Sequence, residues 1–167
     1  MNPIIDFYFY GGFDQNGRTI EEVWSMSDEE WESDHNFIQW LFPLKEPSEF
    51  NSKVPILVDE DIIEFQRLKF KGIHGVLDPL FLSFELILDF YGLEIKKDDC
   101  YIDKSNDFEN RNQWLTKNNH NYLRITRILK SLCLFDQQHC LLKLKKEFVN
   151  EISDINVKYW KDAVCLK

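Results

Sequence analysis

Apolar residues recur along most of the chain at the three- and four-residue spacing of helices. The clearest case runs from Pro79 to Tyr91, where leucine, isoleucine and aromatic residues cover almost the whole circumference of a helix. Such a helix is typical of a buried central element. Asp78 as the N-cap, Pro79 at the first helical position and Gly92 just beyond the end mark its limits. The pattern predicts a domain packed around this helix.

Further helices are indicated by their start signals. Thr19 with Glu22 forms a capping box, and Ser27 precedes a run of acidic residues that favours the positive end of a helix dipole. The second of these helices is expected to continue to about Leu41, because Pro43 removes the residue before it from helical space. The remaining predicted helices start at Asp59 or cover Asn119–Leu134, Gln137–Ile152 and Ile155–Val164.

The segments between the predicted helices read as loops. Lys45–Pro55 is a surface loop, and Lys96–Asn112 is a polar excursion with one short turn of helix. The opening Phe7–Tyr10 is aromatic, and no segment alternates apolar and polar residues over more than four positions. We therefore predict an all-α fold, with residues 1–167 as one domain of about seven to nine helices.

Composition and charge exclude several classes of protein. The net charge is −9, which argues against a nucleic-acid binder, since such proteins depend on clustered positive charge. The longest uncharged apolar runs are far shorter than the ~18 residues that a membrane helix needs. The N-terminus carries Asp6 and lacks a basic region, so it does not read as a secretory signal.

The four cysteines are scattered and form no CxxC pair, which favours reduced thiols in a cytoplasmic protein. They are Cys100, Cys133, Cys140 and Cys165. A zinc site built from Cys133, His139 and Cys140 lacks a four-ligand spacing. We expect no disulfide, no structural zinc and no cofactor, and the sequence contains no phosphate-binding glycine loop, HExxH or GxSxG motif.

Charged residues gather on one side of the predicted helix after Asn119. His120, Arg124, Arg127 and Ser131 fall within a narrow angular range, opposite Tyr122, Ile125, Ile128, Leu129 and Leu132. This stripe is either a solvated basic face or a site that binds an anion or pairs with a carboxylate.

Two further residues could carry chemistry. Asp89 belongs to the apolar central helix, where a carboxylate must be paired or protonated, and we expect it to pair with Arg124, Arg127 or His120. A general acid or base role is the alternative. His35 lies among aromatic and aliphatic neighbours, either as a satisfied core histidine or as part of a pocket wall.

Three segments resemble one known family. His35–Pro43 resembles the HxxIQWLFP signature of the opioid growth factor receptor conserved region. Leu88–Gly92 resembles that family's LDFYG segment, and His120–Leu132 resembles its HNNLRITRILKSL segment. Phe7-Tyr8 and Asn16-Gly17 fall in family order, so the resemblance covers about residues 5 to 163.

The resemblance implies a receptor for an enkephalin-type peptide, since the animal receptor is described as a nuclear-envelope-associated binder of such a peptide that restrains proliferation. The chain departs from the family pattern at Cys133 and Leu134, after the ILKSL run, and it stops soon after the conserved region. By the same resemblance, peripheral membrane association and a nuclear or nuclear-envelope location are alternatives to the cytoplasm.

Three functions remain open. The first is a binding module for a small anionic molecule or a short peptide, with a pocket between the aromatic wall of the Trp31–Phe42 helix and a rim of histidine and arginine. Its predicted ligand-binding residues are His35, Gln39, Trp40, Asp89, His120, Arg124 and Arg127, of which Gln39 and Trp40 come from the shared motif. The second is a hydrolase or transferase with His/Asp acid–base chemistry, whose catalytic residues are unknown. The third is a scaffold without a small ligand.

Overall fold

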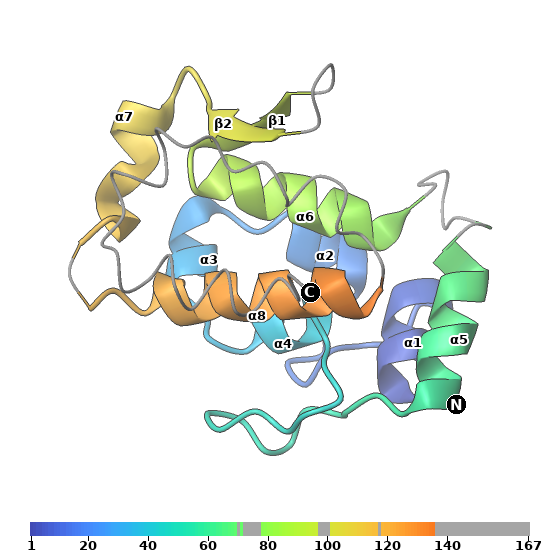
Figure 1. Cartoon of the computed structure of the whole chain (residues 1–167). Helices are drawn as coiled ribbons and strands as arrows, with labels where there is room; N and C mark the ends of the chain where they lie inside the picture. Colours follow the sequence, from blue (N-terminus) through green and yellow to red (C-terminus); the bar gives the residue numbers. More distant parts are fainter. Residues whose placement is uncertain (70, 72–77, 97–100, 117, 136–167) are drawn as a thin grey trace. The chain divides into compact units, whose positions relative to one another are not determined.

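Helices make up more than half of the residues that the computed structural model describes, which are all except 70, 72–77, 97–100, 117 and 136–167 (Figure 1). In chain order the elements are α1 (Pro3–Phe9), α2 (Ile20–Trp24), α3 (Asp28–Ser33), α4 (Phe37–Leu41), α5 (Asp59–Lys69), α6 (Pro79–Phe90), β1 (Leu93–Lys96), β2 (Tyr101–Lys104), α7 (Phe108–Arg111), the 3-10 helix η1 (Asn112–Trp114) and α8 (Asn121–Leu134). The predicted helical class is confirmed.

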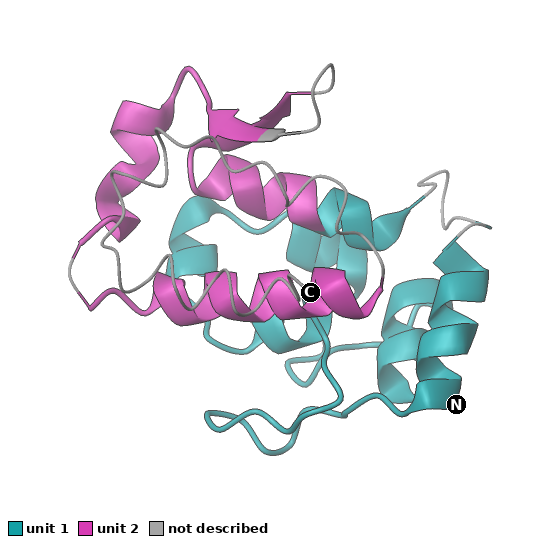
Figure 2. Ribbon diagram, in the orientation of Figure 1, with its two compact units in different colours: residues 1–83 teal, residues 84–167 magenta. Residues whose placement is uncertain are grey.

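The chain divides into two units, which are coloured separately in Figure 2. Unit 1 covers Met1–Ser83 and unit 2 covers Phe84–Lys167, so α6 begins in the first and ends in the second. The single domain expected for residues 1–167 stays a prediction. Among the described helices, none combines the length and the hydrophobicity needed to span a bilayer.

The helix starts read from the sequence are present. The Thr19 and Ser27 side chains each accept a hydrogen bond from the backbone N–H of the third residue of their helix. The Glu22 and Glu30 carboxylates in turn accept from the backbone N–H groups of Thr19 and Ser27. At α6 the Asp78 carboxylate accepts from the Phe81 N–H over 3.0 Å. These caps satisfy backbone donors that the first turn of a helix leaves without partners.

Helix α1 is an element that the sequence analysis missed. It begins with Asn2, whose side chain accepts from the Ile4 N–H over 2.9 Å, followed by Pro3 at the first helical position. Asn before Pro is a start signal that could have identified this helix. The Asn2 side chain also donates to the Asp61 carboxylate over 2.7 Å, which ties α1 to α5.

The long helix expected from Ser27 to Leu41 is wrong, because the chain forms two short helices, α3 and α4. Asp34 ends α3 in an extended conformation, with φ −84° and ψ 121°. Its carboxylate accepts from the Asn36 N–H over 2.7 Å, so a local side-chain turn replaces the continuing helix. As a result, the three residues Asp34, His35 and Asn36 form a connection on the surface of unit 1.

The polar excursion after α6 contains a β-hairpin, which corrects the expectation of no strands. Strands β1 and β2 pair antiparallel, with Leu93 opposite Lys104 and Lys96 opposite Tyr101. Each strand has four residues, too few to stand out as alternation. The predicted short turn of helix is present as α7. The helices predicted at Gln137–Ile152 and Ile155–Val164 lie outside the described residues.

Tyr8 is at the centre of the aromatic core of unit 1. Its ring packs against Phe65 of α5 at a centroid distance of 4.7 Å, and its hydroxyl donates to the Leu41 carbonyl. The side chain is fully buried. Because burial disfavours the phenolate, the pKa of Tyr8 is raised well above its usual value.

This burial predicts a loss of stability at alkaline pH. A folded-state pKa above the unfolded value of about 10 leaves stability intact below that pH and reduces it as pH rises further. We expect thermal denaturation to show a melting temperature that falls above about pH 10, and that falls less steeply in Tyr8→Phe. The exposed Tyr10→Phe is the control and should keep the wild-type slope. An unchanged alkaline slope in Tyr8→Phe would contradict the assignment.

Candidate functional site

The predicted site residues are divided between the two units. Unit 1 contains His35, Gln39 and Trp40, and unit 2 contains Asp89, His120, Arg124 and Arg127. A pocket that joins His35 to the basic residues spans both units and stays a prediction. Each group is therefore described within its own unit.

In unit 2, Arg124 belongs to a buried polar cluster. Its side chain is 5% exposed, and Nη1 donates to Asn121 Oδ1 over 3.0 Å. The Tyr91 hydroxyl donates to the same oxygen over 3.1 Å. Asn121 Oδ1 thus accepts hydrogen bonds from both a guanidinium and a phenol, which makes Asn121 the central residue of this cluster. The sequence analysis did not single out Asn121, although it follows His120 in a family-like segment.

The basic stripe of α8 does not lie on one solvated face. Arg124 and Ser131 are buried, Arg127 is partly exposed and His120 is exposed. Ile128 and Leu132, on the side expected to face the core, are buried too. Arg124, Ile128 and Ser131 are three or four positions apart and so adjoin on the helix surface, which places Arg124 and Ser131 on the buried side of α8, whereas His120 and Arg127 are more exposed.

Asp89 is exposed, contrary to the expectation of a buried carboxylate paired with the basic stripe. Its side chain is 72% exposed, and its carboxylate lies 3.8 Å from Arg111 Nη1. The same nitrogen donates to the Asp89 backbone carbonyl over 3.1 Å. Asp89 occupies the last turn of α6 on its outer side, so the predicted pairing with Arg124, Arg127 or His120 is wrong.

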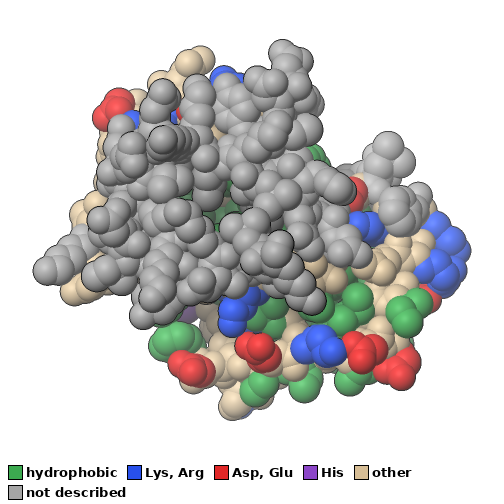
Figure 3. All heavy atoms as spheres, in the orientation of Figure 1, with side chains coloured by type: hydrophobic (Ala, Val, Ile, Leu, Met, Phe, Trp, Pro, Cys, Tyr) green, Lys and Arg blue, Asp and Glu red, His purple; other side chains and the backbone are tan. Residues whose placement is uncertain are grey.

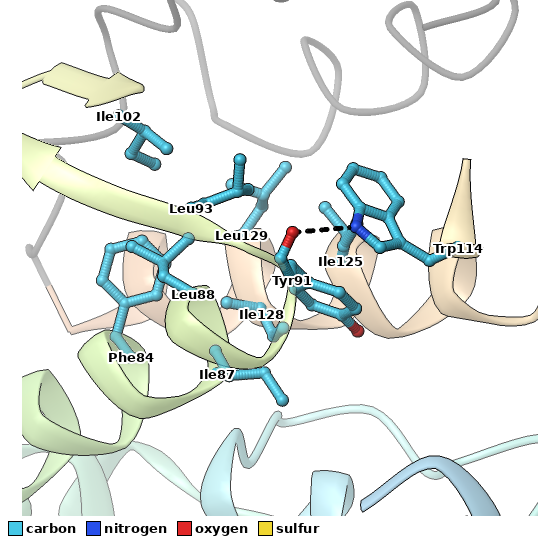
Figure 4. Close-up of a pocket in the computed structure, with 10 residues that line it drawn as sticks. All are labelled: Phe84, Ile87, Leu88, Tyr91, Leu93, Ile102, Trp114, Ile125, Ile128 and Leu129. Carbon is cyan, nitrogen blue, oxygen red and sulfur yellow. Dashed lines mark hydrogen bonds between the residues drawn. The ribbon is translucent and has the colours of Figure 1, made fainter. Parts of the chain in front are cut away.

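Unit 2 also contains an apolar cavity of about 40 Å³ (Figure 4). Its lining comes from α6, the hairpin, η1 and α8, and includes Phe84, Leu93, Ile102 and Ile128. Figure 4 also shows Trp114 donating to the Tyr91 carbonyl, a bond of 3.0 Å. None of the predicted ligand-binding residues lines this cavity. Its size and apolar walls suit a small apolar group and not a charged ligand.

In unit 1, α4 carries two buried polar atoms without a hydrogen-bond partner. Gln39 and Trp40 are 4% and 5% exposed, and neither Gln39 Oε1 nor Trp40 Nε1 has a partner among the described residues. Gln39 Nε2 donates to Ser48 Oγ over a long 3.5 Å. Buried polar atoms are nearly always paired, so an acceptor and a donor on neighbouring residues are unusual.

Ser48 connects Gln39 to an exposed surface made by three segments of unit 1. Its hydroxyl also accepts from the Phe50 N–H over 3.3 Å, and Asn51 Nδ2 donates to Gln15 Oε1 over 2.7 Å and to Asn36 Oδ1 over 3.0 Å. Phe50 is 77% exposed. We call this the aromatic–amide surface, made of Phe13, Gln15, His35, Asn36, Phe50 and Asn51.

An ion-pair cluster fixes the turn that carries Phe13 and Gln15. The Asp14 side chain has no exposed area and accepts from the backbone N–H groups of Asn16 and Arg18. Arg18 Nη2 lies 2.6 Å from Asp14 and 2.7 Å from Asp34. Burial lowers the pKa of Arg18, but the hydrogen bonds to the two carboxylates outweigh it, so the pKa is raised. The cluster thereby joins this turn to the segment before His35.

Other reactive groups do not form a centre in the described part of the chain. There, no three His, Cys, Asp or Glu side chains are placed to hold a metal ion. Cys133 is buried. The structure therefore provides unit 1 with a surface and two buried polar atoms, and unit 2 with a buried polar cluster and an apolar cavity.

Comparison with known proteins gives a consistent result. The sequence profile of the opioid growth factor receptor (OGFr) conserved region matches residues 5–159. An opioid growth factor receptor-like protein 1 of Xenopus tropicalis is 33% identical over 156 residues, covering 90% of this chain and 29% of that protein. The opioid growth factor receptor of Mus musculus is 34% identical over 143 residues, covering 83% and 22%.

The human opioid growth factor receptor is 33% identical over 140 residues, covering 81% of this chain and 20% of that protein. The chain thus spans between a fifth and under a third of the length of these relatives. No solved structure matches the chain.

Proposed function

Because the chain belongs to the opioid growth factor receptor conserved-region family, we propose that it is a binding module that takes up a short peptide at the aromatic–amide surface and α4. The observation that carries this proposal is the buried Gln39 Oε1 without a hydrogen-bond partner among the described residues. The similar proteins of Mus musculus and Homo sapiens are named opioid growth factor receptors. By the family resemblance, opioid growth factor is an enkephalin-type peptide.

The energetics of Gln39 support a ligand role. A buried acceptor without a hydrogen-bond partner lowers the stability of a protein by about 1–3 kcal/mol. A ligand that donates a hydrogen bond to this oxygen removes that cost. A peptide backbone offers N–H donors, and its carbonyls could accept from Trp40 Nε1. Gln39 Nε2 donates to Ser48 Oγ, which accepts from the Phe50 N–H, so these two bonds link the Gln39 side chain to the exposed surface.

A small anion at α8 is the second candidate. Arg124 is almost completely buried on a helix that also carries His120 and Arg127, and guanidinium groups bind carboxylate or phosphate in bidentate form. Arg124 already donates to Asn121, however, which makes the anion the weaker of the two proposals. An acid–base enzyme has less support, since Asp89 is exposed and paired with Arg111. The proposed location is the cytoplasm, or the nuclear envelope as in the family.

Gln39→Leu tests the peptide proposal. We expect the affinity for a bound peptide to fall at least about tenfold, while the free energy of unfolding stays the same or rises because an unpaired buried acceptor is removed. Calorimetric titration of the whole chain with an enkephalin peptide and other short peptides measures the first effect, and urea denaturation measures the second. Inorganic phosphate and acetate serve as the probes for the anion candidate.

Gln113→Leu is the matched control, since Gln113 is exposed and lies in unit 2. It should leave peptide affinity unchanged. A Gln39→Leu protein that loses stability and keeps its peptide affinity would assign Gln39 a purely structural role. Binding of phosphate that is lost in Arg127→Ala, without any peptide binding, would favour the anion instead.

A further inference from the structure

The charge of the protein is divided unequally between the two units. Unit 1 contains 16 acidic and 6 basic residues, a net charge of −10, whereas unit 2 contains 13 acidic and 14 basic residues, a net charge of +1. Essentially the whole net charge of −9 therefore belongs to unit 1. Charge complementarity between partners sets the association rate and the choice of partner.

Half of the acidic excess of unit 1 lies in the segments that contain the aromatic–amide surface. Residues 11–18, 28–36 and 45–53 together contain 8 acidic and 3 basic side chains. Helix α3 contributes half of these acidic residues, with four exposed side chains at Asp28, Glu29, Glu30 and Glu32. Glu49 is exposed beside Phe50. On the face shown in Figure 3, the coloured part of the surface has hydrophobic side chains next to charged ones.

Two exposed aromatic rings distinguish this surface from a merely acidic one. Phe13 is 60% and Phe50 is 77% exposed, and the Gln15–Asn51 bond holds their two loops together. Large exposed aromatic side chains mark interaction sites and carry much of the binding energy when a partner covers them. Aromatic faces also attract lysine and arginine by cation–π interaction. Rings among carboxylates therefore match a partner that is positively charged.

We infer that the aromatic–amide surface binds a lysine- or arginine-rich peptide segment of another protein, an inference that rests on the proposed peptide-binding function. The buried Gln39 Oε1 supports this independently of charge, because an acceptor needs a donor and a basic segment offers ammonium, guanidinium and backbone N–H groups. Nucleic acids and anionic lipids are disfavoured, since the acidic surface repels them.

Fluorescence anisotropy with the whole chain tests the inference. The probes are synthetic peptides of equal length that differ only in carrying lysine, glutamine or glutamate at the same positions. We expect the lysine peptide to bind at least about tenfold more tightly than the glutamine peptide, and the glutamate peptide not to bind. Raising the salt from about 50 mM to about 300 mM should weaken the lysine peptide selectively, because it shortens the range of electrostatic attraction.

Variants locate the binding site. Phe50→Ala should weaken the lysine peptide about tenfold, and Glu49→Gln should weaken it about threefold without affecting the glutamine peptide. The matched control is Ile63→Ala, since Ile63 is also exposed in unit 1 but lies on α5, outside these segments. Ile63→Ala should bind like the wild type.

The outcomes separate this inference from the proposed function. Equal binding of the lysine and glutamine peptides, lost in Gln39→Leu, would overturn the basic preference and leave peptide binding intact. No binding of any peptide would overturn both. If Phe50→Ala does not weaken binding of the lysine peptide, the binding is general electrostatic attraction to an acidic protein, and the inference is overturned. Self-association that Phe50→Ala abolishes, measured by analytical ultracentrifugation, would identify a second copy as the occupant and overturn the inference.

Discussion

Asn121→Ala is expected to lower the free energy of unfolding by about 3 kcal/mol, because it removes the shared acceptor of a buried cation and a buried phenol. Asn121 Oδ1 accepts from Arg124 over 3.0 Å and from the Tyr91 hydroxyl over 3.1 Å, and all three residues are buried. Each donor loses one buried hydrogen bond, and a bond from a charged donor contributes more than a bond between neutral groups. The cavity left by the amide adds to this loss.

Urea denaturation followed by tryptophan fluorescence measures the effect. Asn110→Ala is the matched control, since Asn110 is exposed and its side chain donates to the Asp107 carboxylate. A double-mutant cycle with Tyr91→Phe separates the phenol from the guanidinium. A change in unfolding free energy below about 0.5 kcal/mol in Asn121→Ala would show that the cluster does not depend on this amide.

Helix starts could be predicted because they depend on neighbouring residues. The boxes of Thr19 with Glu22 and Ser27 with Glu30, and the N-cap at Asp78, each involve atoms within three positions of one another. The same local reasoning applied to Asn2 and Pro3 would have found α1. Local chemistry of this kind survives in almost any tertiary context, so the sequence identifies it reliably.

Short elements were missed because competing local bonds decide them. The apolar spacing of Trp31, Ile38 and Phe42 predicts one continuous helix, yet the Asp34 carboxylate accepts from the Asn36 N–H and ends α3. The hairpin of β1 and β2 depends on pairing between strands of four residues, which hydrophobic periodicity does not reveal. In both cases the decisive hydrogen bonds are contacts that no spacing rule contains.

The site was harder to predict because helical periodicity gives angles and not environments. Arg124 was placed by its angular position and Asp89 by its membership of an apolar helix, but Arg124 is buried beside Asn121 and Asp89 is exposed beside Arg111. Arg124 adjoins Ile128, which lies four positions further along α8, so it shares the buried side of the helix and not a solvated face. The Gln15–Asn51 contact joins residues 36 positions apart, which only tertiary structure can bring together.

Asp14→Ala is expected to lower the free energy of unfolding of the protein by about 2 kcal/mol and to weaken peptide binding about tenfold. The Asp14 side chain is completely buried and accepts from the Asn16 and Arg18 backbones as well as from the Arg18 side chain. The expected loss of stability is smaller than for a fully buried ion pair, because Arg18 is partly exposed and keeps Asp34 as a partner. Without Asp14 the turn that presents Phe13 and Gln15 loses its fixed geometry.

Asp14→Asn separates the turn from the charge. Its amide oxygen can still accept from the Asn16 and Arg18 backbones, so it should recover peptide binding while stability remains below that of the wild type. Asp107→Ala, which removes an exposed partner of Arg111 in unit 2, should change neither the melting temperature nor the binding. Thermal denaturation and peptide anisotropy on the wild type and the three variants measure stability and binding. Peptide binding by Asp14→Ala at the wild-type affinity would show that the turn does not form part of the binding surface.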